Sequence, residues 1–400
     1  MPDTDAGSAR AIAERPRIAA ATALDAFAAI APTIDTHRVW ADEHARMAPE
    51  VCEAARTAGL FLAWAPRDYG GAELPLPELM ELVVEVGAAD ATVGWHLGNS
   101  AAVSFASAQL EPELAADVFS GPAGPFGFSI VAGGRLVPTD GGYLLDGRWP
   151  NITGVLDAPW VGIGAVVHDG EGPRQVNGAP DVRLCIVPTA ELDVERTWDA
   201  AVAMRGTGSH AASAKGVFVP EGLAHSWAKP LIVDRPLYRV GMMVAGPVFA
   251  AALCIGAVRR ALEVTVELAG SKISAGTGMA FRDSPRVQAT VGEASAAISG
   301  LRAAMVDASA AMLAAAEHGR PPADVRGRLW STAYWSFDRC RELVSDVSSI
   351  ATSAVYQGHN PVESTVRDVH AIAAGHEATR GLQAAFGRVL LGLRPSHPFF

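Results

Sequence analysis

The sequence predicts an α+β fold, because three successive segments differ in hydrophobic periodicity and in their content of turn residues. The chain has 400 residues, of which 50% are hydrophobic, so it can bury a core over two or three domains. Helical patterns at both ends enclose a middle segment of short β-rich runs. We expect a disordered tail at 1–10, a helical domain at 11–122, a β-barrel domain at 123–233 and a four-helix bundle at 234–400.

The first domain reads as helices joined by turns. Apolar residues recur at helical spacing between Pro77 and Gly87. Pro49 suits the first turn of another helix, which we expect to end towards Gly59. The link 65–71 contains Pro, Asp and two Gly residues, so it predicts a turn.

The middle domain reads as short strands. Asp140-Gly141-Gly142 is a hairpin signal between two β-rich runs. Short strands with regular turns favour a small barrel or sandwich. The runs that we expect to form strands are 135–137, 143–145, 160–163, 183–187 and 216–219.

The C-terminal domain reads as a bundle. Long helices are expected near 242–269, 286–318, 323–355 and 362–391, and their short connections favour antiparallel neighbours. The stretch 366–377 is expected to be helical and holds two histidines, His370 and His376. Histidine changes charge near neutral pH, so this stretch is a candidate site.

Composition excludes several classes of function. The formal net charge is -11 and no basic run is present, which argues against nucleic acid as a partner. No stretch reaches ~18 uninterrupted apolar residues, and the N-terminus has no signal-peptide core, so we expect no membrane span. The four separated cysteines predict reduced thiols in a cytoplasmic protein.

Three motifs resemble the acyl-CoA dehydrogenase superfamily, in which an α-helical domain, a β-barrel and a four-helix bundle follow one another. The stretch 146–154 resembles the strand that presents hydroxyl and amide groups to the flavin. The stretch 204–210, followed by 217–220, resembles the second β-domain signature of the flavin-dependent monooxygenase branch, which includes the actinorhodin polyketide hydroxylases. Arg367-Asp368-Val369-His370 resembles the C-terminal signature of that branch.

The resemblance implies a set of flavin contacts. Thr153 would offer a hydroxyl and a backbone N–H to flavin N5 and O4, where negative charge develops on the reduced ring. Ile152 belongs to the same stretch, and Asn151 stands where the dehydrogenases have an aromatic stacking residue. Trp95 is expected in the flavin wall, with Ser129 as a further contact. The plain alternative is that Asn151 to Thr153 only end a strand.

The resemblance also marks a catalytic position. Dehydrogenases carry a glutamate base nine positions after the Arg of the Arg-Asp pair, and here that position is His376, with Glu377 next to it. In the monooxygenase branch a histidine in this region assists the substrate or the oxygenated flavin. His376 is therefore the first candidate and His370 the second. His96 is expected either to face the cavity and act with His376 or to face solvent.

Two departures from the family concern the cofactor. Arg282 is displaced from the position of the Arg that grips the FAD pyrophosphate, and Gln357 lies where a Gly-rich turn would approach the ADP. Both departures favour FMN over FAD, with Arg282 suited to a single phosphate. The alternative for Arg282 is a surface loop arginine. No strand-GxGxxG-helix fingerprint for NAD(P)H is present, so a separate flavin reductase is expected.

These expectations describe a two-component monooxygenase that uses reduced FMN, or FAD as the alternative. It would hydroxylate a small aromatic, polyketide or amine substrate with O2, through a flavin peroxide. The resemblance further implies a homotetramer. Two other functions stay open: an FAD-dependent acyl-CoA dehydrogenase that uses Glu377 as base, and a non-catalytic flavin-binding relic.

Overall fold

The computed structural model describes residues 20–119, 121, 124–170, 172–176, 178–226, 229–273, 278–356 and 360–397. It divides into two compact units. The first holds residues 1–74, 95–201 and 205–238, and the second holds 75–94, 202–204 and 239–400. The tail expected at 1–10 lies outside the described residues, and the three-domain boundaries stay a prediction.

The helix Pro49–Thr57 of the first unit begins and ends at the predicted signals. Pro49 stands in the first turn of its helix, where its missing N–H has no helical partner to lose. The residue after the C-cap of that helix, Gly59, has a φ of +69°. The helices are α2 (Ala20–His44), α3 (Pro49–Thr57), α6 (Pro112–Phe119) and the part of α5 (Ala91–Ala106) from Trp95 onward.

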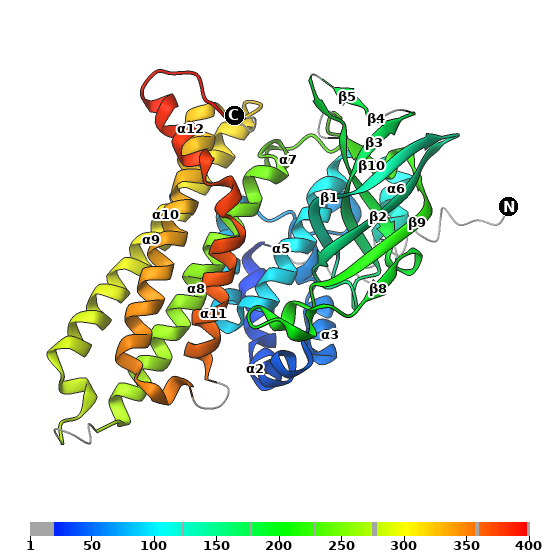
Figure 1. Cartoon of the computed structure of the whole chain (residues 1–400). Coiled ribbons are helices and arrows are strands. Elements are labelled where there is room, and N and C mark those ends of the chain that lie inside the picture. The colour runs from blue at the N-terminus through cyan, green and yellow to red at the C-terminus, as the bar shows by residue number, and fades with distance from the viewer. Residues whose placement is uncertain are drawn as a thin grey trace. The chain divides into compact units, whose positions relative to one another are not determined.

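An eight-stranded sheet forms the rest of the first unit (Figure 1). Its order is β10-β7-β3-β1-β2-β9-β8, with β4 paired to β3, and only β1 and β3 run parallel among these pairs. The predicted hairpin joins β1 to β2 through Gly141, which has a φ of +73°. The strands are β1 (Gly127–Thr139), β2 (Gly142–Ile152), β3 (Trp160–Asp169), β4 (Gly172–Pro173), β7 (Val182–Pro188), β8 (Asp193–Glu195), β9 (His210–Pro220) and β10 (Ala224–Ser226), and β5 (Gln175–Val176) pairs separately with β6 (Ala179–Pro180).

The second unit is helical, and its long helices α8 to α11 pack against one another (Figure 1). Helix α8 is its centre, because it contacts α4, α9, α10 and α11. Gly256 permits the contact with α4, since a Cβ there would lie 2.0 Å from the Val84 carbonyl oxygen. The helices are α4 (Leu76–Ala89), α8 (Met242–Ser271), α9 (Pro285–Glu317), α10 (Ala323–Ala351), α11 (Pro361–Gly375) and α12 (Gly381–Leu390), and the short α7 (Pro236–Arg239) spans the boundary between the units.

Two predicted helices differ from the structure. The helix expected at 323–355 ends at Ala351, because Thr352 adopts a positive φ of +67°. The single helix expected at 362–391 was wrong: it is two helices, separated by a 3-10 turn, η10 (Glu377–Thr379). Glycines 375 and 381 flank this break, and glycine is a poor residue for a helix interior. His376 therefore caps α11 and does not lie within a helix.

Among the described residues, two helices have the length and mean apolar composition of a membrane span, although neither is an uninterrupted apolar run. They are Val244–Ser271 and Pro285–Glu317. The apolar stretch of the first is 83% buried, as in the core helix of a soluble protein, whereas that of the second is 33% buried. These two features are weak evidence for a membrane.

Candidate active site

The pairing of β2 with β9 brings two sequence motifs together in the first unit. Ile152 at the end of β2 pairs with His210 at the start of β9. Because the strands are antiparallel, the residue after Ile152 comes next to the residue before His210. These residues are Thr153 and Ser209, from the two motifs that resemble the β-domain signatures. The backbone confirms the approach, since the Gly154 N–H donates to the Thr207 carbonyl oxygen over 3.0 Å.

Hydrogen bonds link an indole to three hydroxyl groups at this junction. The Trp95 Nε1–H donates to Thr153 Oγ1 over 3.2 Å. Thr153 Oγ1 lies 3.0 Å from Ser209 Oγ, which lies 2.9 Å from Thr207 Oγ1. We call Thr153, Ser209 and Thr207 the hydroxyl chain, and none of them is more than 5% exposed. Burial lowers the local dielectric, so these hydrogen bonds polarise one another more strongly than they would in water.

His96 supports the junction from α5. Its Nε2 donates to the Gly206 carbonyl oxygen over 3.1 Å, and the side chain is 1% exposed. The solvent-facing alternative for His96 was therefore wrong. The opposite side of the ring meets Gly154, whose φ is +71°, and a Cβ there would lie 2.8 Å from His96 Nδ1. Glycine is required at 154 for both reasons.

The remaining residues predicted to contact flavin differ in exposure. Ile152 is fully buried and Asn151 is exposed. Ser129 is 5% exposed and follows Phe128, which forms a β-bridge with Thr153. Two exposed apolar residues follow Ser129 in the chain, Ile130 and Val131. The apolar surface of this strand and the hydroxyl groups of Ser129 and Thr153 suit a flat ring that is polar at one edge, so these residues fit a flavin.

His376 lies at the end of α11 in the second unit. Its Nδ1–H donates to the Ile372 carbonyl oxygen over 3.0 Å, which assigns the proton of the neutral ring to Nδ1. The ring stacks on Phe337 with centroids 4.9 Å apart and an angle of 25° between the planes. Burial lowers the pKa of His376, opposed in part by the bond to Ile372. The imidazole is thus neutral at pH 7, with Nε2 as the basic nitrogen.

The two competing residues near His376 are more exposed. The Glu377 side chain is 56% exposed and forms an ion pair with Arg380 Nε at 2.8 Å. His370 is exposed on α11. Neither side chain is enclosed by the protein. The structure therefore distinguishes His376 from its neighbours by burial.

Two contacts hold the turn that carries His376. The Thr379 hydroxyl donates to the His376 carbonyl oxygen over 3.0 Å and hydrogen-bonds the Tyr334 hydroxyl. Arg380 binds the Asp338 carboxylate through two nitrogens, at 2.8 and 2.9 Å. Bidentate pairs of this kind fix geometry as well as charge. The turn is consequently anchored to α10 by two residues that follow Glu377.

The Arg-Asp pair of the third motif has a structural role. The Asp368 carboxylate accepts the Met204 N–H over 2.5 Å, and Arg367 donates to the Val202 carbonyl oxygen. Arg367 also pairs with Glu363 at 2.6 Å. The pair thus holds segment 202–204, which belongs to the same unit.

Arg205, in the 204–210 motif, and Arg282, the candidate phosphate ligand, differ in environment. Arg205 donates to the carbonyl oxygens of Asp42, Asp199 and Ala201 over 2.5, 2.9 and 2.6 Å, so it closes a turn. The Arg282 side chain is 69% exposed. Its role in phosphate binding stays a prediction, and Gln357 lies outside the described residues.

Sequence reasoning missed two members of the site. Thr207 was not singled out, and Gly154 was only part of a motif. The Thr-Gly-Ser spacing at 207–209 was a usable signal, because it places two hydroxyl residues around a glycine that has a φ of +51°. Their contact with Thr153 depends on the strand register, which short-range patterns do not give.

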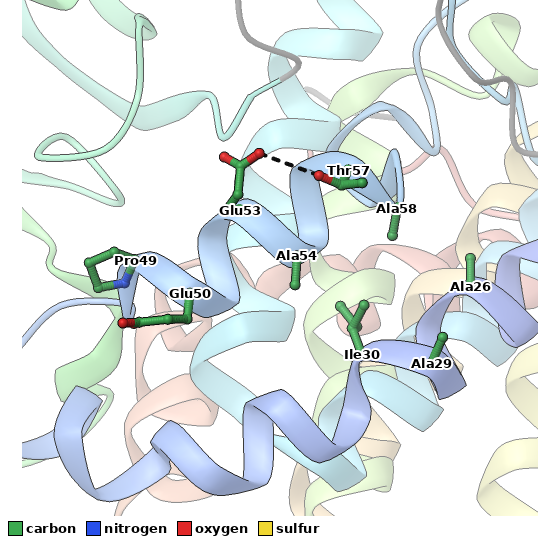
Figure 2. A pocket seen from close by; sticks show the side chains of 9 residues that line it. All are labelled: Ala26, Ala29, Ile30, Pro49, Glu50, Glu53, Ala54, Thr57 and Ala58. Atoms are coloured by element: carbon green, nitrogen blue, oxygen red, sulfur yellow. Dashed lines mark hydrogen bonds between the residues drawn. The ribbon is translucent and has the colours of Figure 1, made fainter.

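A groove of about 760 Å³ lies between α2 and α3 and contains none of the predicted site residues. Figure 2 shows its apolar floor, which includes Ile30, and its carboxylates, Glu50 and Glu53. Two carboxylates oppose a flavin phosphate, so this groove does not suit the cofactor. Among the residues described, no group of three His, Cys, Asp or Glu side chains is placed to hold a metal ion.

Comparison with known proteins agrees with this architecture. Residues 248–380 match the family described as acyl-CoA dehydrogenase, C-terminal domain. The oxygenase component of the FADH(2)-dependent resorcinol hydroxylase of Rhizobium sp. is 27% identical over 376 residues, which cover 88% of this chain and 90% of that protein. The indole-3-acetate monooxygenase of Pseudomonas putida is 26% identical over 267 residues, or 66% of each chain.

Solved structures share the fold over the whole chain. XiaF from Streptomyces sp., in complex with FADH2 and glycerol, has a TM-score of 0.85 and 23% identity, and the match covers 99% of this chain and 100% of that chain. The predicted α+β class, with helices, a central sheet and a C-terminal bundle, is confirmed. Residues 248–380 thus match an acyl-CoA dehydrogenase family, and a relative that covers most of the chain is named as the oxygenase component of a flavin-dependent hydroxylase.

Proposed function

We propose that this protein is the oxygenase component of a two-component monooxygenase. It hydroxylates a small aromatic, polyketide or amine substrate with O2, and a separate reductase supplies the reduced flavin. The main support for the proposal is the environment of His376. The partly buried His376 imidazole, whose pKa is lowered by desolvation, stands at the sequence position that the resemblance assigns to a dehydrogenase base, while the adjacent Glu377 is exposed and paired with Arg380.

His376 acts as the general base. With Nδ1–H bound to the Ile372 carbonyl, Nε2 is the nitrogen that accepts a proton from a phenol or amine. Removal of that proton makes the substrate more electron-rich at the atom to be oxygenated. Stacking on Phe337 keeps the ring in one orientation. When bound, the reduced flavin supplies the activated oxygen.

The cofactor is reduced FMN or FAD. Trp95, Ser129 and Thr153 would contact the ring, with Thr153 facing N5 and Arg282 placed for a phosphate. The donor set around Thr153 supports this assignment. The Rhizobium relative is named FADH(2)-dependent and XiaF was solved with FADH2, so FAD carries more weight than the sequence alone suggested.

We further propose a cytoplasmic homotetramer. The four cysteines are free and buried, as expected for reduced thiols. The apolar stretch of α9 is 33% buried within one chain, which leaves apolar surface for another copy.

The alternative function, a non-catalytic flavin-binding protein, predicts that no substrate is turned over.

Isotope-labelled O2 tests the function. The protein is mixed with a generic flavin reductase, FMN or FAD, and resorcinol, indole-3-acetate or p-hydroxyphenylacetate, the substrates that relatives are named for. We expect a hydroxylated product that carries a labelled oxygen atom, detected by mass spectrometry. Bleaching of bound flavin by acyl-CoA thioesters without O2, and no labelled product, would instead establish the dehydrogenase.

A further inference from the structure

The hydroxyl chain has two possible hydrogen-bonding patterns with the same heavy-atom positions. Each hydroxyl group has one proton to donate and two lone pairs to accept. The Trp95 indole can only donate, so Thr153 Oγ1 always accepts from it. The two remaining contacts, of Thr153 with Ser209 and of Ser209 with Thr207, permit either direction of donation.

The direction decides what Thr153 offers to a ligand. If Thr207 donates to Ser209 and Ser209 to Thr153, both lone pairs of Thr153 are used and its own proton points outward. If Thr153 donates to Ser209 and Ser209 to Thr207, Thr153 keeps a lone pair that faces outward. Rotation of the three hydroxyl groups converts one pattern to the other, and every proton stays on its own oxygen.

We propose that Ser209 and Thr207 are positioning residues that switch Thr153 between hydrogen-bond donor and acceptor as the flavin changes oxidation state. The inference rests on the proposed function, in which Thr153 faces flavin N5. An oxidised flavin has a lone pair at N5 and needs a donor, whereas a reduced flavin has an N–H at N5 and needs an acceptor. Burial of all three hydroxyl groups makes an unmatched pattern costly.

Thr207 is the residue to substitute, because its hydroxyl would act on the flavin through the side chains of Ser209 and Thr153. In Thr207→Val, Ser209 can still donate to Thr153, so the donor state of Thr153 survives. The acceptor state is lost, because the Ser209 proton no longer has the Thr207 oxygen as its acceptor. The backbone contact from the Gly154 N–H uses the Thr207 carbonyl and is kept.

Thr207→Val should therefore weaken binding of reduced flavin by roughly tenfold relative to oxidised flavin, the effect of a buried donor left without a partner. The reduction potential of bound flavin should fall accordingly. Thr207→Ser keeps the hydroxyl and should restore the wild-type ratio. Thr265→Val, at a 1% exposed threonine of α8, is the matched control for buried replacement and should leave the ratio unchanged.

The experiment is a pair of titrations of each flavin-free protein, with oxidised FMN or FAD and, anaerobically, with the dithionite-reduced flavin. A lowered ratio of reduced-flavin affinity to oxidised-flavin affinity in Thr207→Val, and in neither control variant, supports the inference. Equal ratios in wild type and Thr207→Val overturn it and leave the proposed function standing. If wild type binds neither flavin in either state, the proposed function fails and the inference fails with it. If Thr207→Val does not fold, a wild-type ratio in Ser209→Ala would equally overturn the inference.

Discussion

At the scale of single residues, the hydrogen bonds of Thr153 explain why particular residue types surround it. Trp95 supplies a donor that cannot accept, and Ser209 supplies a group that can do either. Gly154 then turns the backbone at a φ of +71°, beside the His96 ring. The Thr153 hydroxyl oxygen is thus held by Trp95 of α5 and by Ser209, which directly precedes β9.

Gly154 gives a stability prediction at this scale. Gly154→Ala should lower the free energy of unfolding by about 2 kcal/mol or more, because it combines an unfavourable φ with a clash against His96. Urea unfolding measures the effect. Gly141→Ala is the matched control, since Gly141 has a φ of +73° and open space around its missing Cβ, and should cost about 1 kcal/mol. Equal losses in the two variants would show that His96 does not constrain position 154.

The candidate site could be predicted only in part from the sequence. Trp95 and Thr153 were identified from motifs, and the structure joins them by a hydrogen bond. The contact of Thr153 with Ser209 depends on the pairing of Ile152 with His210, residues far apart in the chain. The register of β2 against β9 depends on residues distant in the chain. Local sequence patterns therefore identified both motifs but could not predict that the motifs touch.

At the scale of secondary-structure elements, the end of α11 determines where His376 lies. The sequence pattern favoured a continuous helix, because alanine and apolar residues dominate 366–391. Gly375 and the 3-10 turn after it interrupt that helix. As a result, His376 bonds back to Ile372 and stacks on Phe337, and its carbonyl accepts from Thr379. Helix propensity did not predict this break between α11 and α12, and the break determines the surroundings of the His376 side chain.

The longest helices were predicted well, whereas the expected strand runs cover only parts of β1, β2, β3 and β9. Periodicity and turn residues located the β1–β2 hairpin and the helices α8 and α9 to within about two residues. The end of α10 was missed, because a β-branched Thr352 at a φ of +67° breaks the usual preference for glycine there. Terminal residues of helices depend on tertiary contacts more than helix interiors do.

At the scale of the whole molecule, buried histidines predict acid sensitivity. Burial, together with Lys229 and Arg183, lowers the pKa of His225 from 6.5 to about 4. Burial likewise lowers the pKa values of His210 and His376. In the unfolded chain these groups bind protons at a higher pH, so their contribution to stability is present above pH 6.5 and is lost as the pH falls through the window between the two pKa values.

His225 alone should contribute a loss of about 2 kcal/mol in the free energy of unfolding between pH 7 and pH 5. Urea unfolding at both pH values measures this. His225→Gln, which does not titrate in this range, should show a smaller loss than wild type. If the variant and the wild type lose the same stability, the pKa of His225 is not lowered in the folded protein.

The central claim is that His376, and not Glu377, is the base of an oxygen-dependent reaction. The most direct test compares product formation by His376→Ala and Glu377→Gln with the wild-type enzyme, at saturating reduced flavin and with flavin affinity measured in parallel. We expect His376→Ala to lower hydroxylation roughly 100-fold or more while flavin affinity stays within about twofold. Glu377→Gln should stay within about threefold of wild type, because its carboxylate is exposed and paired with Arg380. Near-normal hydroxylation in His376→Ala, with activity abolished in Glu377→Gln, would contradict the claim.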